Sequence, residues 1–284
     1  MLAIVVSTTA DEVELASDAL WSLGVVAIEE RAAADTVELW TSLGDDADVV
    51  KGAAAKHLVR WPWRFVEVDE TISESWRHHA SPIYVDSDLV ICPSWVRFVA
   101  AAGVSVVRIE PGSTFGLGDH PTTLLSMRAL RSALFDGATV LDVGCGSGVL
   151  AVSASVLGAS RAVAIDISPA SVPTTQANAV ANDVADRIQV STTPLEQLDG
   201  LFDIVVANIL APTLIELADD LRRVVAPGGR LIVSGVLADH HDHVEAALRP
   251  FRRTHRQTLD GWAALSFGHP FSSGETSSTS SAGR

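Results

Sequence analysis

Apolar and polar residues follow two different rhythms along the chain. In the first 70 residues, short apolar runs predict strands at 2–7, 25–30, 36–41 and 64–68. Between them, apolar positions recurring every three to four residues predict helices at 9–21 and 45–58. The order strand-helix-strand-strand-helix-strand is that of a ferredoxin-like unit. We therefore predict a small α+β domain over residues 1–70 with a docking role, because it carries no obvious chemistry.

The second rhythm begins near residue 109. After a strand at 104–109 and a glycine-rich loop, near-continuous apolar strands alternate with helical stretches. We expect these strands at 139–143, 162–167, 188–191, 204–208 and 231–234. This alternation predicts a doubly wound, Rossmann-like α/β domain over residues 109–268, with a parallel sheet covered by helices on both faces. Two closely spaced strands near 253–258 and 262–267 predict a hairpin that leaves one antiparallel strand at the sheet edge. Seven strands are then expected in this sheet.

Two further segments complete the organisation. Residues 71–108 are expected to bridge the domains, and the small, polar residues 269–284 are expected to form a disordered tail. The composition is that of a folded soluble protein, with 48% hydrophobic and 19% charged residues. No apolar run is long enough to cross a membrane and no signal peptide is recognisable, so we expect a cytoplasmic protein. Cys92 and Cys145 are the two cysteines, which predicts neither a disulfide framework nor a zinc site.

The charge balance bears on possible partners. The formal net charge is −15, from 35 acidic and 20 basic residues. Such a surface repels phosphate backbones, so nucleic acid is not the expected direct partner. It would attract a basic protein, although acidity that serves only solubility is an equally open explanation.

The strongest local signal is a glycine-rich turn between a strand and a helix. Gly144, Gly146 and Gly148 follow Asp142, and glycines at such a turn let the backbone approach a ligand closely. The spacing G-x-G-x-G differs from the G-x-G-x-x-G of nicotinamide-binding proteins. An acid beside the loop would oppose a pyrophosphate but suits a ligand with an ammonium and a sulfonium group. A turn needed only for packing is the alternative.

Two polar residues follow later strands of the same domain. Asp166 comes 18 residues after Gly148 and could accept hydrogen bonds from both hydroxyls of a ribose, or simply cap the next helix. Asn208 ends the strand 204–208, where its amide oxygen could accept an N–H and hold a substrate nitrogen in line with a methyl carbon. Asn208 could instead cap the helix that begins near residue 211. Because three strand ends meet at one sheet edge, we predict a ligand site there.

Four segments together resemble the bacterial PrmA family, the methyltransferases of large-subunit ribosomal protein eleven. They are ICPSW at 91–95, PGSTFGLGDHPTT at 111–123, the glycine motif at 142–148 and ANILA at 207–211. The resemblance covers about residues 74–268, and the N-terminal domain fits only loosely. It implies a class I methyltransferase that uses S-adenosylmethionine and methylates lysine side chains and an N-terminal α-amine.

The resemblance also implies roles for particular residues. Thr123, Gly144, Asp166 and Asn208 correspond to cofactor contacts, with Asn208 also close to the acceptor. Phe115, Gly116 and Gly118 are expected to help close the pocket. The full expected set is Asn208 as catalytic residue, and Thr123, Asp142, Gly144, Gly146, Gly148, Asp166, Asn208, Phe115, Gly116 and Gly118 as cofactor-binding residues. Three features depart from the family: Asp119, the pair Ser113-Thr114 and the short N-terminal domain.

We therefore expect a monomeric protein N-methyltransferase whose acceptor is a basic, ribosomal protein. Alternatives are another protein's lysine or a small-molecule amine as acceptor, a nicotinamide-dependent oxidoreductase, or a non-catalytic adaptor. No catalytic base stands out, and the role of His120 is left open. We interpret Cys145 as a small loop residue and Trp61 and Trp63 as core or interface residues. His240, His241 and His243 are interpreted as part of a solvated helix face, with no metal expected.

Overall fold

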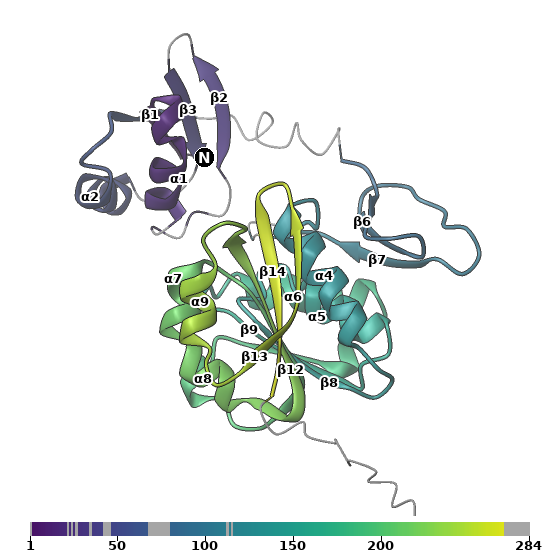
Figure 1. Cartoon of the computed structure of the whole chain (residues 1–284). Coiled ribbons are helices and arrows are strands. Elements are labelled where there is room, and N and C mark those ends of the chain that lie inside the picture. Colours follow the sequence, from purple (N-terminus) through teal and green to yellow (C-terminus); the bar gives the residue numbers. More distant parts are fainter. Residues whose placement is uncertain are drawn as a thin grey trace, which may run out of the picture. The chain divides into compact units, whose positions relative to one another are not determined.

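The structure is a computed structural model that describes residues 2–21, 23, 25, 28–33, 36–41, 47–67, 80–111, 114 and 116–269. The chain divides into two compact units, Met1–Ala80 and Ser81–Arg284 (Figure 1). Residues 81–108, expected as a bridge, thus lie in the second unit. Apart from His269, the tail for which disorder is expected lies outside the described residues. None of the helices within these ranges combines the length and hydropathy needed to cross a membrane.

The first unit has the predicted ferredoxin-like order. Its elements are β1 (Leu2–Thr8), α1 (Val13–Trp21), β2 (Glu29–Ala33), β3 (Thr36–Thr41), α2 (Ala47–His57) and β4 (Trp63–Glu67). The strands form one antiparallel sheet in the order β2-β3-β1-β4. Ile4, Val6 and Leu39 pack with α1 and α2 on one sheet face. Strand β2 begins at Glu29, four residues later than expected.

A small sheet opens the second unit. Its strands are β5 (Ile83–Tyr84), β6 (Leu89–Pro93) and β7 (Ser105–Ile109), and β6 and β7 run parallel. Two asparagine side chains hold β7 in place: Asn178 lies in helix α6 (Ser171–Ala181) and Asn182 is the C-cap of that helix. The Asn182 and Asn178 Oδ1 atoms accept hydrogen bonds from the backbone N–H groups of Arg108 and Glu110, each at 2.8 Å. These bonds attach the small sheet to the large domain.

The large domain is the predicted seven-stranded, doubly wound domain. Its remaining elements are α4 (Pro121–Ala133), β8 (Thr139–Val143), α5 (Val149–Val156), β9 (Arg161–Ile165), β10 (Ile188–Ser191), β11 (Phe202–Asn208), α7 (Ala211–Glu216), α8 (Ala218–Arg223), β12 (Val225–Leu237), α9 (Asp242–Ala247), β13 (Arg252–Leu259) and β14 (Trp262–Gly268). The sheet order is β10-β9-β8-β11-β12-β14-β13. Alternate residues of β8, such as Val140 and Leu141, enter two separate cores. Helices α4, α5 and α6 cover one face of the sheet and α7, α8 and α9 the other (Figure 1).

The C-terminal hairpin differs from the prediction in one respect. One strand, β14, is antiparallel to its neighbours as expected, but it lies between β12 and β13 instead of at the edge. The chain reaches the outer position first, through α9 and β13. The tight turn at Asp260 and Gly261, both with positive φ, then brings β14 back beside β12. The predicted edge position was therefore wrong, and β13 forms that edge.

Candidate active site

Three neighbouring parallel strands end at the same level. In the sheet register, Val143 of β8 lies opposite Ile165 of β9 and Ala207 of β11. The residue after each of these positions is Gly144, Asp166 or Asn208. The three residues therefore form a row along the carboxyl edge of the sheet, where doubly wound domains bind ligands.

The glycine loop lies against the end of β9. Gly144, Gly146 and Gly148 have φ values of 73°, 54° and 76°, a region that L side chains rarely adopt. The backbone N–H groups of Gly144 and Cys145 donate to the Ile165 carbonyl at 2.8 and 3.1 Å. A Cβ atom on Gly148 would lie 2.5 Å from the Thr175 side chain. The loop thus needs glycine both for its conformation and for its packing under α6.

Asp166 links the loop to the end of β9. Its Oδ2 accepts the Gly146 N–H and its Oδ1 accepts the Ser168 N–H, each at 2.8 Å. A carboxylate offers about four lone-pair sites, so both oxygens keep capacity for further donors such as ribose hydroxyls. The side chain is half-buried at the row's outer end.

Ile167 is a candidate that the sequence analysis missed. It directly follows Asp166 and is 97% exposed, although the segment before it is buried. An apolar side chain held in solvent beside a ligand site offers a surface for a flat apolar group. The signal was weak in the sequence, because an isoleucine after a strand is expected to enter the core.

Asn208 is joined to the start of helix α4. The helix begins at Pro121, so Thr123 lies in its first turn and not in a loop. The Asn208 Nδ2 donates to Thr123 Oγ1 at 3.5 Å, and Ser234 Oγ of β12 donates to the Thr122 carbonyl at 3.2 Å. Among the residues that the structure describes, none donates to Asn208 Oδ1. The amide thus faces Thr123 with its nitrogen and leaves its oxygen as an acceptor.

The segment before α4 packs against the glycine loop. Ser147 Oγ donates to the Gly116 carbonyl at 2.6 Å, and a Cβ atom on Gly118 would lie 2.8 Å from Ile91 Cδ1. Thr114, one of the departures from the family, is buried and donates its hydroxyl to the Pro111 carbonyl at 2.6 Å. Phe115 and Ser113 lie outside the described residues.

Asp142 is placed differently from the other predicted residues. Its side chain has no exposed surface, and its Oδ2 accepts the Ala151 N–H of helix α5 at 3.0 Å. No partner is found for its Oδ1 within the described part of the chain. Burial raises the pKa of this carboxyl to about 7, against the lowering effect of the Ala151 N–H. The Asp142 side chain therefore lies in the protein interior, whereas Asp166 and Asn208 are partly exposed.

His120 caps α4 and contacts a second residue missed from the sequence. Its Nδ1 lies 2.7 Å from Thr122 Oγ1, and its ring meets the Trp262 ring edge-on at 5.4 Å. Burial lowers the pKa of His120, although the charge of Asp119 opposes this shift. The imidazole is therefore neutral at pH 7. Trp262 begins β14, far away in sequence, and only the packing of β14 against α4 reveals it.

The other residues noted in the sequence lie in a buried loop, near the start of α9 or in the first unit. Cys145 is buried, and burial raises the pKa of its thiol, so no thiolate nucleophile forms. His241 lies with Asp242 and Glu245, whose ligand atoms are within 4.8 Å of one another, while His240 and His243 are exposed. Glu245 already pairs with Arg253. Trp61 is a core residue of the first unit.

Comparison with known proteins decides the family. Residues 56–269 match the family described as "Ribosomal protein L11 methyltransferase (PrmA)". This chain belongs to that family. A ribosomal protein L11 methyltransferase from Citrifermentans bemidjiense is 43% identical over 208 residues, which cover 71% of this chain and 68% of that protein. One from Methylococcus capsulatus is 35% identical over 286 residues, covering 92% and 97% of the two chains.

A solved structure agrees with this assignment. The ribosomal protein L11 methylase from Lactobacillus delbrueckii subsp. bulgaricus superposes with a TM-score of 0.61 at 33% identity, covering 66% of this chain and 96% of that one. The chain is therefore an S-adenosylmethionine-dependent methyltransferase with a Rossmann-like domain, as predicted from the PrmA motifs. A nicotinamide-dependent oxidoreductase is excluded as its family.

Proposed function

We propose that this enzyme methylates amines of ribosomal protein L11, both lysine side chains and the N-terminal α-amine, in the cytoplasm. The main observation behind this proposal is the row of strand ends, in which Asn208 contacts Thr123. This arrangement leaves a hydrogen-bond acceptor for an amine beside the glycine loop. The choice of acceptor is supported by the names of the relatives, one of which matches along nearly its whole length.

The residues of the row fit S-adenosylmethionine. The loop glycines leave no side chain between backbone and ligand, and Asp166 keeps free acceptor capacity for the ribose. Ile167 offers an exposed apolar surface for the adenine. When bound, the cofactor supplies a methyl group on a positively charged sulfur. Gly144, Gly146, Asp166 and Ile167 are thus the proposed binding residues.

Asp142 takes a supporting role in this proposal. A side chain with no exposed surface cannot touch the cofactor, but its bond to Ala151 N–H fixes the first turns of α5. The helix in turn fixes the glycine loop that precedes it. Asp142 is therefore a positioning residue.

Asn208 is the proposed catalytic residue. Its free Oδ1 accepts an N–H of the acceptor amine and directs the nitrogen lone pair, while Thr123 fixes which way the amide faces. The amine must be neutral to react, whereas a free lysine has a pKa of ~10.4. Loss of water from the amine in the cleft favours the neutral form, and the proton passes to solvent.

Mass spectrometry of purified L11 after incubation with enzyme and S-adenosylmethionine tests the proposal. We expect mass additions in steps of one methyl group on lysines and on the N-terminus, and far slower addition with the Asn208→Ala variant. A lysine-rich unrelated protein and a small primary amine serve as control acceptors. Methylation of a control acceptor but not of L11 would show that the substrate is wrong while the enzyme class is right.

A further inference from the structure

One stretch of this acidic chain is strongly basic. Residues 249–256, RPFRRTHR, hold four of the chain's 20 basic residues and no acidic one. They comprise the end of the turn after α9 and the first half of β13, the edge strand of the large sheet. Every side chain from Arg252 to Arg256 is exposed. We call Arg249, Arg252, Arg253, His255 and Arg256 the basic edge.

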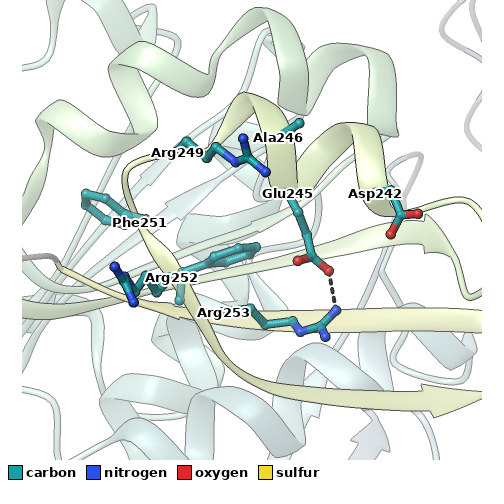
Figure 2. A pocket seen from close by; sticks show the side chains of 8 residues that line it. Asp242, Glu245, Ala246, Arg249, Phe251, Arg252 and Arg253 are labelled. Atoms are coloured by element: carbon teal, nitrogen blue, oxygen red, sulfur yellow. Dashed lines mark hydrogen bonds and ion pairs between the residues drawn. The ribbon is translucent and has the colours of Figure 1, made fainter.

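The basic edge borders a depression of about 510 Å³. Arg249, Arg252 and Arg253 line it from the turn and β13, and Glu245 of α9 lies opposite (Figure 2). Phe251 and Phe267 form part of the lining but are nearly buried, so the polar groups dominate what a ligand would meet. The depression is open to solvent, and it could admit one end or one segment of a larger partner.

Most of the positive charge in this region is not neutralised. Glu245 pairs with Arg253, and Asp242 is fully exposed beside it (Figure 2). Arg256 donates to the Ala238 carbonyl at 2.6 Å, which leaves its charge unpaired. Within the described ranges, neither Arg249 nor Arg252 forms an ion pair. Three guanidinium groups are thus available to an anion.

The strand places its arginines on both faces of the sheet edge. A bulge at Thr254 puts Arg253 and Arg256 on one face, opposite Phe267 and Leu265 of β14. Arg252, opposite Gly268, lies on the other face. A single small anion would meet only one of the available groups, whereas an extended polyanion can contact several.

Protection of an edge strand from pairing with other chains is the simpler explanation. That role is served by charges of either sign, and this chain has 35 acidic residues to draw on. The basic edge carries only positive charge, although the net charge of the chain is negative. Charge complementarity therefore points to a polyanion.

We propose that the basic edge binds the phosphate backbone of RNA without sequence preference. The biological partner rests on the proposed function, because a ribosomal protein acceptor works in contact with RNA. The net charge of −15 opposes RNA elsewhere on the surface, so the contact is confined to this edge. RNA bound there would leave the strand-end row (Gly144, Asp166 and Asn208) free, since β12 and β14 lie between β13 and β11, the nearest strand of the row.

The test measures fluorescence polarisation of a labelled 20-nucleotide RNA with the full chain. Three to four phosphate contacts predict that affinity falls about 20- to 50-fold between 50 and 200 mM salt. The triple variant Arg249→Gln, Arg252→Gln, Arg256→Gln should lose about tenfold or more in affinity at 50 mM salt and most of the salt dependence. The matched control, Arg97→Gln, Arg161→Gln, Arg187→Gln, changes the net charge equally and should bind like the wild type.

Each outcome has a clear consequence. No binding at 50 mM salt, equal losses in both triple variants, or tighter binding of polyglutamate than of RNA would overturn the proposal. If the glutamine variant aggregates, the corresponding triple lysine variant should keep binding, and Arg249→Gln and Arg252→Gln alone should each weaken the salt dependence. The triple glutamine variant should methylate free L11 at the wild-type rate, so failure of RNA binding is distinguishable from failure of the proposed function.

Discussion

The two large sheets of this protein are built from the same elements and differ in strand direction. In the parallel part of the second sheet, Val143, Ile165 and Ala207 end their strands side by side, and the polar residues that follow collect at one edge. In the antiparallel first sheet, neighbouring strands end at opposite edges. The first sheet therefore cannot assemble a site from strand ends.

The first sheet gathers its polar groups on a face instead. Directly paired residues share a face. Glu29 pairs with Trp40 and Arg31 with Glu38 on the face opposite Ile4, Val6 and Leu39. Arg64 lies on the same face, because it and Trp40 both pair with the buried Val5. The Arg31 guanidinium lies 4.0 Å from the Trp40 ring centre, and Arg64 pairs with Glu38 at 2.9 Å. A flat surface of this kind suits contact with another protein, whereas an edge suits a small ligand. We propose substrate docking for the first unit on this basis.

The largest effect is expected from replacing Asn208, the residue of the strand-end row that is proposed to hold the acceptor amine. Asn208→Ala should lower kcat about 100-fold, because the acceptor nitrogen loses its orientation. Cofactor affinity should change little, since Asp166 and the loop are intact. Steady-state kinetics on a verified acceptor, with Gln189→Ala on β10 as control, measure this. Wild-type kcat in the Asn208 variant would refute the orientation role.

Replacing Asp166, at the other end of the row, should lower the affinity for the cofactor instead of kcat. Asp166→Ala should weaken S-adenosylmethionine binding about 10- to 100-fold, the usual cost of losing hydrogen bonds to a charged group. Asp166→Asn keeps an acceptor for Gly146 N–H and should lose less. Calorimetry gives both affinities. Equal affinity in all three proteins would remove Asp166 from the cofactor site.

The row could be predicted from the sequence because it depends on local order alone. A buried strand followed by a polar residue places that residue at the carboxyl edge of any parallel sheet, so Asp166 and Asn208 were found without coordinates. Thr123 was reached only through the resemblance to PrmA.

The contacts made by long-range packing could not be predicted. Trp262 meets His120 only because β14 inserts beside β12, which the hairpin pattern did not reveal. The full burial of Asp142 depends on α5 covering it, and a glycine motif alone does not show on which side of the loop the acid lies.

The buried carboxyl of Asp142 should make the stability of the protein depend on pH. Its folded-state pKa of about 7 exceeds the unfolded value near 3.9, so between these values the folded state holds the extra proton. The free energy of unfolding should therefore fall as pH rises through this window, by at most about 1.4 kcal/mol per pH unit. Asp142→Asn should lose this slope. Urea unfolding from pH 5 to 8 measures it.

A matched variant controls for other titrating groups. Asp199→Asn, at an exposed position, should keep the wild-type slope. Parallel pH profiles of the wild type and Asp142→Asn would contradict a buried, proton-holding Asp142.

A smaller effect is expected at Ile167. Ile167→Ser should weaken cofactor binding about 5- to 10-fold through lost apolar contact. The melting temperature should stay unchanged, because the side chain is 97% exposed in the free protein. Val99→Ser, at a position 89% exposed and outside the row, is the control. A lower melting temperature with unchanged affinity would make Ile167 a structural residue.

The smallest effect tests the face of the first sheet. Trp40→Ala should raise the KM for the protein acceptor about fivefold, since aromatic side chains carry much of the energy of protein contacts. It should leave the affinity for S-adenosylmethionine and the rate on a short lysine peptide unchanged, because the proposed cofactor residues belong to the second unit and a short peptide lacks the folded surface that would dock. Leu15→Ala is the matched control: this residue is 52% exposed on α1, which packs on the other face of the sheet.

Steady-state kinetics with L11 and with the peptide give all four values. If both variants raise KM equally, the first unit acts through its stability; if neither does, the acceptor is bound by the second unit alone.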